Sequence, residues 1–212
     1  MPGTAVHKSV SADPFLHLMF PMDTLASAEY RSLRDTIRER GTARVWIFVV
    51  GLVAWAALAM ATASLASLPV AMLGPLLILG AVFEVVYALH VGVERIGRYI
   101  QVFHEPTAGW EHTAMAFGQA YPGSGPDPLF ALFFAGAAVL NFIPVLLAEP
   151  VVIEVVVIGT AHLLFIVRLI VARRHAARQR SVDLERFEKL KAAMAATASP
   201  AAGPPSSRNT AN

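Results

Sequence analysis

The chain of 212 residues contains no cysteine, and only 15% of its residues are charged. The absence of cysteine excludes disulfide bonds, metal sites with thiolate ligands and palmitoyl anchors. The low charge content accompanies a hydrophobic content of 56%, which is too high for an ordinary soluble domain. The composition therefore predicts an integral membrane protein.

Basic residues are absent from two of the three segments that separate the long apolar runs. Six of the 17 Lys and Arg residues precede the first run, two lie between the second and third, and nine lie from Arg168 onward. None lies between the first and second runs or between the third and fourth. Because short cytoplasmic loops of membrane proteins are enriched in Lys and Arg, both ends of the chain are expected in the cytoplasm. The apolar runs are residues 45–68, 70–93, 129–147 and 151–172.

Each run can cross a bilayer, whose hydrocarbon core takes roughly 20 apolar residues of helix. The outer turns, residues 67–69 and 148–150, are short, and each places Pro beside the start of the returning helix, where its missing N–H costs nothing. We therefore expect an all-α integral membrane protein with four transmembrane helices, arranged as two antiparallel hairpins in up-down-up-down order. Abundant Ala, Val, Arg and Gly with only three Lys favours a bacterial cytoplasmic (inner) membrane as its location.

The first 44 residues form the predicted cytoplasmic N-terminal segment. Within it, Tyr30, Leu33 and Ile37 are spaced as one apolar stripe of a helix over about residues 27–40. Gly41 follows this helix and is expected to interrupt it. The pattern predicts an amphipathic helix that lies along the cytoplasmic surface of the membrane before the chain turns into the first span.

The remaining polar segments are also assigned to the cytoplasm. Residues 94–128 form the predicted loop after the second span, and the second helix is expected to run on into it until Pro106. Residues 173–195 predict a basic amphipathic helix, and residues 196–212, rich in Ala, Pro and Ser, predict a disordered tail. The two cytoplasmic helices thus flank a four-helix transmembrane domain, residues 45–172.

Three polar residues are predicted near the middle of the membrane. Counted from the cytoplasmic ends of their runs at about 1.5 Å per residue, Glu84, Asn141 and His162 all lie roughly 15–18 Å deep. Ionisable and amide groups in a span usually face the bundle interior, so these residues are expected to form one cluster. The cluster could relay protons or ions, or it could be a hydrogen-bonded clamp that fixes the register of the helices. A third alternative is that some of these groups face a second subunit.

The basic residues near the cytoplasmic ends of the runs are expected to bind lipid. Despite the sequence-derived pI of about 9.2, we expect no nucleic acid as a partner, because anionic lipid headgroups of the cytoplasmic leaflet account for this distribution. The expected partners are the bilayer itself and either a second copy of the chain or another membrane protein. The predicted headgroup contacts are Arg44, Arg95, Arg98, Arg168, Arg173, Arg174 and Arg178.

A group of metal-ligand residue types lies on the cytoplasmic side, but its spacing is not specific. Neither His-Glu-x-x-His nor the paired Glu-x-x-His of di-iron bundles is present. The alternative for Glu94 is a helical i, i+4 pair with Arg98. We therefore expect no metal and no cofactor, and the candidates that would hold a metal are His90, Glu94, His104, Glu105, Glu111 and His112.

The sequence contains no recognisable catalytic motif. A nucleophile elbow, a phosphate-binding glycine loop and a Ser/His/Asp constellation are all missing. We expect a non-enzymatic membrane protein that acts as a scaffold, assembly or regulatory component through its cytoplasmic face. The alternative is a small oligomeric, proton-coupled transporter or channel that uses Glu84 and His162 as a relay.

Overall fold

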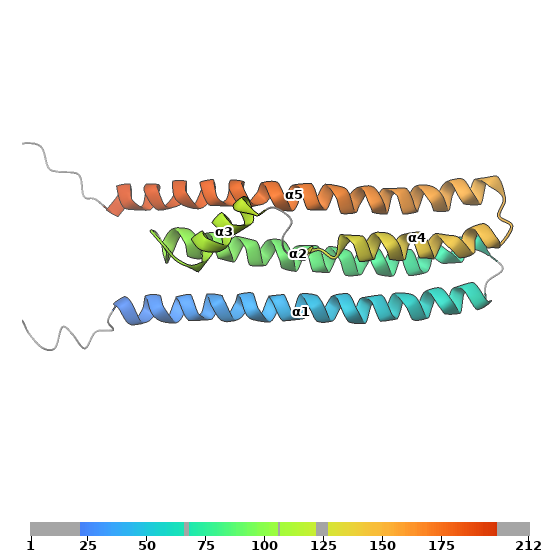
Figure 1. The fold of residues 1–212 in the computed structure, drawn as a ribbon, viewed down its shortest axis with the longest axis horizontal. Coiled ribbons are helices and arrows are strands. Elements are labelled where there is room, and N and C mark those ends of the chain that lie inside the picture. Colours follow the sequence, from blue (N-terminus) through green and yellow to red (C-terminus); the bar gives the residue numbers. More distant parts are fainter. Residues whose placement is uncertain (1–21, 66–67, 106, 122–126, 199–212) are drawn as a thin grey trace, which may run out of the picture.

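The computed structural model describes residues 22–65, 68–105, 107–121 and 127–198. Its regular secondary structure is entirely helical within these ranges, as the sequence predicts, and the long helices run side by side (Figure 1). The elements are α1 (Met22–Leu65), the 3-10 helix η2 (Pro69–Met72), α2 (Leu73–Phe103), α3 (Trp110–Ala120), α4 (Ala131–Leu147) and α5 (Val152–Ala198).

Three helical stretches within the described residues are long and apolar enough to cross a membrane: Leu25–Ser64, Pro69–Phe103 and Val152–Ala198. The apolar α4 is shorter, with 17 residues. Large side chains are exposed on the outside of these helices, such as Leu132 and Val152, which are each 80% exposed. So much exposed apolar surface is compatible with a helical bundle that is surrounded by lipid.

The N-terminal half of α1 does not form a separate helix on the membrane surface. α1 is continuous from Met22 to Leu65, so the predicted interruption at Gly41 is wrong. A single glycine weakens a helix by only about 1 kcal/mol. Side chains on both sides of Gly41, including Arg34 and Arg44, contact the α2–α3 part of the bundle and hold α1 straight.

α5 is likewise one helix rather than a span followed by a separate cytoplasmic helix. It continues through residues 173–195 without a break and ends at Ala198, so residues 196–198 are helical and not part of a tail. Most of the predicted tail, residues 199–212, lies outside the described residues.

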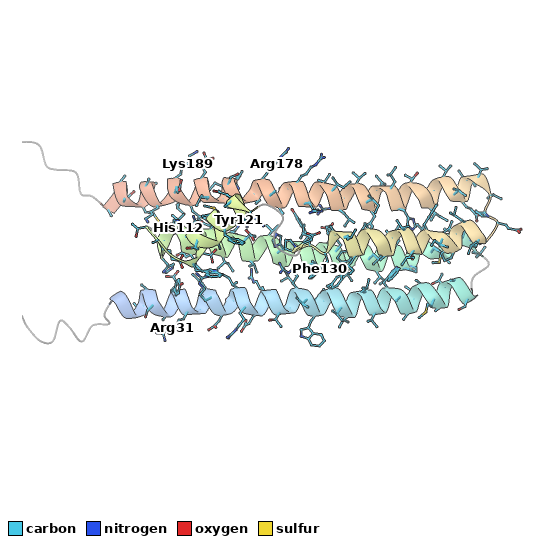
Figure 2. All side chains as sticks on the ribbon, in the orientation of Figure 1. Arg31, His112, Tyr121, Phe130, Arg178 and Lys189 are labelled. Carbon is cyan, nitrogen blue, oxygen red and sulfur yellow. The ribbon has the colours of Figure 1, made fainter. Side chains whose placement is uncertain are left out.

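The segment predicted as a loop contains a helix that the sequence pattern did not reveal. α2 runs on to Phe103, close to the predicted end at Pro106. α3 then packs against the polar end of α2, beside α5 in Figure 1. Figure 2 places Arg31, His112 and Lys189 at this same end of the bundle, which we call the polar end.

α2 lies at the centre of the bundle, with α1 and α5 on either side and α4 packed against α2 and α5. The core is rich in aromatic rings: Phe83 of α2 lies edge-to-face with Phe134 of α4 at 5.4 Å and with Phe165 of α5 at 6.2 Å. α1 approaches α2 closely at Gly51, where an added methyl group would overlap the branched side chain of Val82. The bundle is therefore closely packed both where aromatic rings fill the space between helices and where a glycine lets two helices approach each other.

Candidate functional site

A buried hydrogen-bond network joins four elements within the apolar part of the bundle. Asn141 of α4 is only 1% exposed. Its amide nitrogen lies 2.9 Å from the carbonyl oxygen of Met72 and 3.1 Å from Nε2 of His162. Its oxygen accepts the indole N–H of Trp55 at 3.2 Å. The Asn141 side chain therefore ties α1, η2 and α5 to α4.

The tautomer of His162 follows from its partners. Nδ1 lies 2.8 Å from the carbonyl oxygen of Ile158, which can only accept, so Nδ1 carries the hydrogen. Nε2 then accepts from the Asn141 amide. His162 is a neutral imidazole whose two nitrogens are both bound, an arrangement that fixes helix register.

The structure brings Asn141 and His162 together, but Glu84 does not belong to the network. Glu84 lies twelve residues after Met72, or about 18 Å further along the bundle axis. Its carboxylate faces outward and binds Arg168 at 2.7 Å. The depth counted from Glu94 was wrong, because α2 continues past the apolar part and Glu94 lies within the polar end.

Trp55 is the member of this network that sequence reasoning missed. It lies in the middle of the first apolar run, whereas tryptophans of membrane proteins are enriched at the interfaces. A buried indole N–H usually has a hydrogen-bond partner. A mid-span Trp was therefore the available signal that an acceptor such as Asn141 lay opposite.

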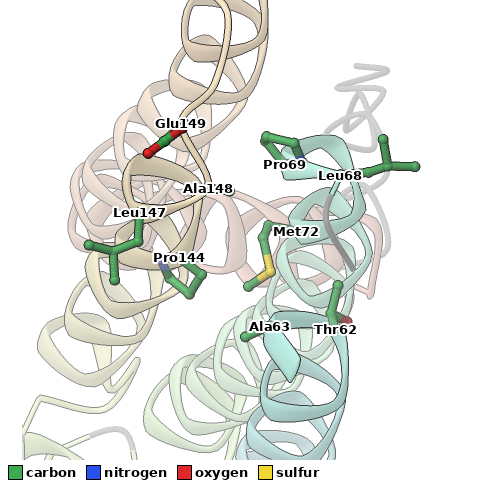
Figure 3. A pocket seen from close by; sticks show the side chains of 9 residues that line it. All are labelled: Thr62, Ala63, Leu68, Pro69, Met72, Pro144, Leu147, Ala148 and Glu149. Carbon is green, nitrogen blue, oxygen red and sulfur yellow. The ribbon is translucent and has the colours of Figure 1, made fainter. Parts of the chain in front are cut away.

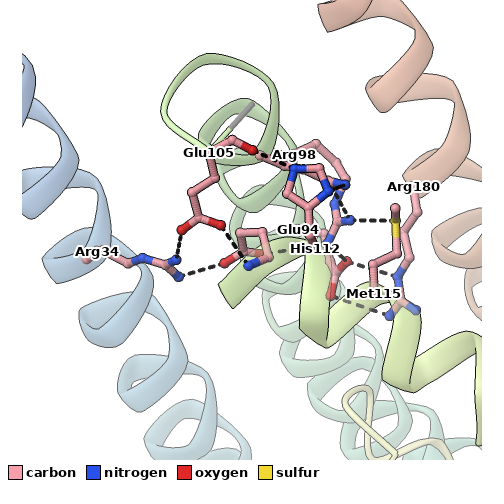
Figure 4. Close-up of polar contacts among 9 residues, drawn as sticks. Arg34, Glu94, Arg98, Glu105, His112, Met115 and Arg180 are labelled. Atoms are coloured by element: carbon pink, nitrogen blue, oxygen red, sulfur yellow. Dashed lines mark hydrogen bonds and ion pairs between the residues drawn. The ribbon is translucent and has the colours of Figure 1, made fainter. Parts of the chain in front are cut away.

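At the polar end, Arg34 of α1 binds two carboxylates at once. Its guanidinium lies 2.8 Å from Glu105 and 2.6 Å from Glu111 (Figure 4). Both acids are more than 90% buried. The Tyr30 hydroxyl donates to Glu105 at 3.0 Å, and the backbone N–H of Glu111 donates to the same carboxylate at 2.9 Å.

From Glu111 of α3, further ion pairs between arginines and carboxylates lead to α5. Arg98 of α2 is 6% exposed and lies 3.6 Å from Glu111 and 3.9 Å from Glu94. Glu94 in turn binds Arg180 of α5 at 2.9 Å. Gly97 leaves room for the Glu111 carboxylate, because a side chain there would lie within 2.8 Å of it. We call the six residues that join the four helices the charge clamp: Arg34, Glu105, Glu111, Arg98, Glu94 and Arg180.

The three carboxylates among the metal candidates form ion pairs with arginines of the clamp. The three histidines that accompany them also have protein contacts: His90 lies 3.1 Å from Arg44, His112 contacts the Glu105 carbonyl, and His104 packs on the rings of Tyr30 and Tyr99. In the part of the chain that the structure describes, no group of three or more His, Asp or Glu is arranged to hold a metal ion.

The seven arginines predicted at lipid headgroups fall into three groups. Arg98 cannot reach a headgroup because it is buried in the clamp, so that prediction is wrong. Arg174 and Arg178 are exposed on α5, where contact with headgroups stays a prediction. The others have acidic or histidine partners: Arg44 with His90, Arg95 with Asp183, Arg168 with Glu84 and Arg173 with Asp127.

The charged state of Glu105 is stabilised by its partners. Burial by itself raises the pKa of this carboxyl, but the N–H of Glu111, the Tyr30 hydroxyl and the Arg34 guanidinium together hold the pKa below its ordinary value. A folded-state pKa below the unfolded one stabilises the fold above the unfolded pKa, near 4.3. That contribution is lost as the pH falls through the folded-state pKa.

We therefore expect Glu105→Gln to weaken the pH dependence of stability. At pH 7 the variant should be about 1–3 kcal/mol less stable, because the charge-assisted bonds to Arg34 are lost. Between pH 5 and pH 3 its stability should fall less steeply than that of the native chain, as measured by thermal unfolding in detergent. Glu149→Gln, an exposed acid in the turn at the other end, is the control. Parallel pH curves for native chain and Glu105→Gln would contradict the assignment.

The end opposite the clamp has a pocket of about 530 Å³ between the two turns (Figure 3). Met72 and Pro144 lie on its walls, and Glu149 is the only ionisable residue among those that line it. The pocket is mainly apolar, and its one carboxylate gives it no donor and acceptor pattern that would select a ligand.

Comparison with protein-family models, with curated proteins and with solved structures found no match to this chain. The function is therefore inferred from the sequence and the structure of this chain alone.

Proposed function

We propose that the chain is a multi-pass protein of a bacterial inner membrane, with four crossings and both ends in the cytoplasm. The distribution of basic residues supports this orientation. The 17 residues of α4 extend about 25 Å, and a bilayer can adapt to a span slightly shorter than its hydrocarbon core of about 30 Å.

We further propose that it is a non-enzymatic scaffold, assembly or regulatory component that binds a protein partner at the polar end. The observation that carries this proposal is the charge clamp. Its arginines and carboxylates neutralise one another, so they hold α1, α2, α3 and α5 in one arrangement beyond the apolar part of the bundle. Such a preordered surface lowers the entropy lost on binding.

The last turns of α5 offer a contact surface on this end. Lys191 donates to the carbonyl oxygen of Val102 at 2.6 Å, which marks where the end of α2 meets α5. Leu190 and Met194 are 50% and 57% exposed and stand one helical turn apart. Exposed apolar residues at this spacing fit an amphipathic helix of a partner protein.

A photoreactive residue placed at Leu190 tests this proposal in native membranes. We expect one discrete protein adduct, identified by mass spectrometry, that disappears when Met194→Glu is introduced on the same surface. The control position is Glu185, whose side chain is 63% exposed and lies about 140° around the axis of α5 from Leu190. Labelling that is the same at both positions, or confined to lipid, would overturn the docking surface.

Flux measurements in proteoliposomes separate the scaffold from the transporter alternative. The native chain is expected to conduct neither protons nor small solutes above the background of empty vesicles, because Glu84 is paired with Arg168 on the outside of the bundle and both ring nitrogens of His162 are bonded. A flux that is present in the native chain and lost in Glu84→Gln would refute the scaffold proposal in favour of transport.

A further inference from the structure

Glu84 and Arg168 form an ion pair on the outside of the bundle rather than inside it. The carboxylate and guanidinium lie 2.7 Å apart, yet their side chains are still 49% and 37% exposed. The Arg168 guanidinium also lies over the ring of Tyr87, 4.9 Å from its centre, which fixes its direction toward α2. The pair therefore presents both charges on the surface between α2 and α5.

The position of this pair along the helices places it at membrane depth. Glu84 lies 15 residues after Pro69, and Arg168 lies 16 residues after Val152. At about 1.5 Å per residue, each is roughly 23 Å from the end with the turns. A hydrocarbon core of about 30 Å that begins at those turns encloses both charges at the same depth. Half-exposed charges at that depth face lipid unless another protein surface covers them.

The residues around the pair are apolar and include small side chains. On α2, Leu77, Ala81 and Ala88 are exposed and share the helix face of Glu84, at intervals of three and four residues. On α5, Leu164 and Val171 flank Arg168 and are also exposed. Alanines at such positions allow a neighbouring helix to approach closely.

We propose that this surface, the pair face, binds a second copy of the chain in a twofold dimer. Its members are Leu77, Ala81, Glu84, Ala88, Leu164, Arg168 and Val171. Two copies inserted in the same direction are related by a rotation axis along the membrane normal, which preserves depth. When that axis passes between α2 and α5, the carboxylate of one copy faces the guanidinium of the other.

The choice of a second copy as the occupant follows from charge complementarity. The pair face carries one negative and one positive charge side by side at one depth, so it is complementary to itself under this rotation. A lipid tail provides no group that would satisfy either charge. The inference does not depend on the scaffold proposal, since a dimer through α2 and α5 leaves the polar end free.

Single-cysteine crosslinking tests the dimer in membranes, where the lack of native cysteine keeps the background low. We expect Ala81→Cys or Ala88→Cys to form a disulfide-linked dimer of twice the chain mass under mild oxidation. Ala57→Cys, an exposed alanine on α1, is the matched control and should stay monomeric. Monomer at all three positions, a dimer only through Ala57, or an adduct with a different protein would each overturn the proposal.

Charge reversal distinguishes pairing between copies from pairing within one copy. Introduced into the Ala81→Cys chain, Glu84→Arg leaves two positive charges on the face and Arg168→Glu leaves two negative charges. Each variant alone should crosslink about tenfold less, because like charges then meet across the axis. Co-expressed with different tags, the two variants should restore crosslinking as mixed dimers, although the pair within each chain is still broken. Crosslinking that stays low in the mixture, or that is unaffected in the single variants, would overturn the proposal.

Discussion

Replacing Arg34 with glutamate is expected to release the N-terminal half of α1 from the bundle. The substitution removes the cation that binds Glu105 and Glu111 and places a third carboxylate beside them. Breaking a buried ion pair costs about 3–5 kcal/mol, and the added repulsion acts in the same direction. We therefore expect amide hydrogen exchange over residues 22–44 to accelerate by about 100-fold or more, while exchange in α4 stays unchanged.

Arg38→Glu is the matched control for this prediction. Arg38 lies one turn further along α1, but its side chain is 76% exposed and its ion pair with Asp35 lies on the surface. Such pairs contribute about 0–1 kcal/mol, so exchange in α1 should change little. Equal effects of the two substitutions would show that the clamp does not hold α1.

Replacing Asn141 with alanine is expected to destabilise the apolar part of the bundle by about 2–4 kcal/mol. The change leaves the indole N–H of Trp55, the Met72 carbonyl and Nε2 of His162 without their common partner. It also leaves a small void, because the side chain is 1% exposed. The free energy of unfolding in mixed micelles is the quantity to measure.

Leu140→Ala provides the comparison on the same helix. Leu140 is 59% exposed on the outside of α4, so truncating it removes contacts with detergent or lipid rather than with the bundle. Its effect should stay within about 0.5 kcal/mol. If Asn141→Ala and Leu140→Ala destabilise the chain equally, the network does not join the helices.

The all-helical fold could be predicted from the sequence because apolar runs of this length leave few alternatives in a membrane. The break at Gly41 could not be judged in the same way. Whether a helix continues through a glycine depends on contacts from distant residues, here Arg34 with Glu105 and Glu111 and Arg44 with His90. The sequence shows the glycine but not those contacts, and tertiary packing overrode the local preference.

The site was predictable only where depth was counted from a correct reference. The predicted proximity of Asn141 and His162 is confirmed, because α4 and the apolar part of α5 cover the same range of depth. The depth predicted for Glu84 was wrong because the apolar pattern of α2 runs on beyond the level at which α4 starts. The charge clamp was not recognised, since its acids were read as metal ligands and its Arg98 as a lipid contact. A list of residue types does not reveal which opposite charge lies beside each acid.

The most direct test of the account is the side of the membrane on which each end of the bundle lies. Single cysteines at Leu68 and Glu149, in the two turns, should react with a membrane-impermeant maleimide on intact cells, because both residues are exposed. A cysteine at Lys189 should react only after the membrane is permeabilised. If the maleimide labels the cysteine at position 189 on intact cells, or labels the cysteines in the two turns only after permeabilisation, the result would contradict four crossings with both ends in the cytoplasm.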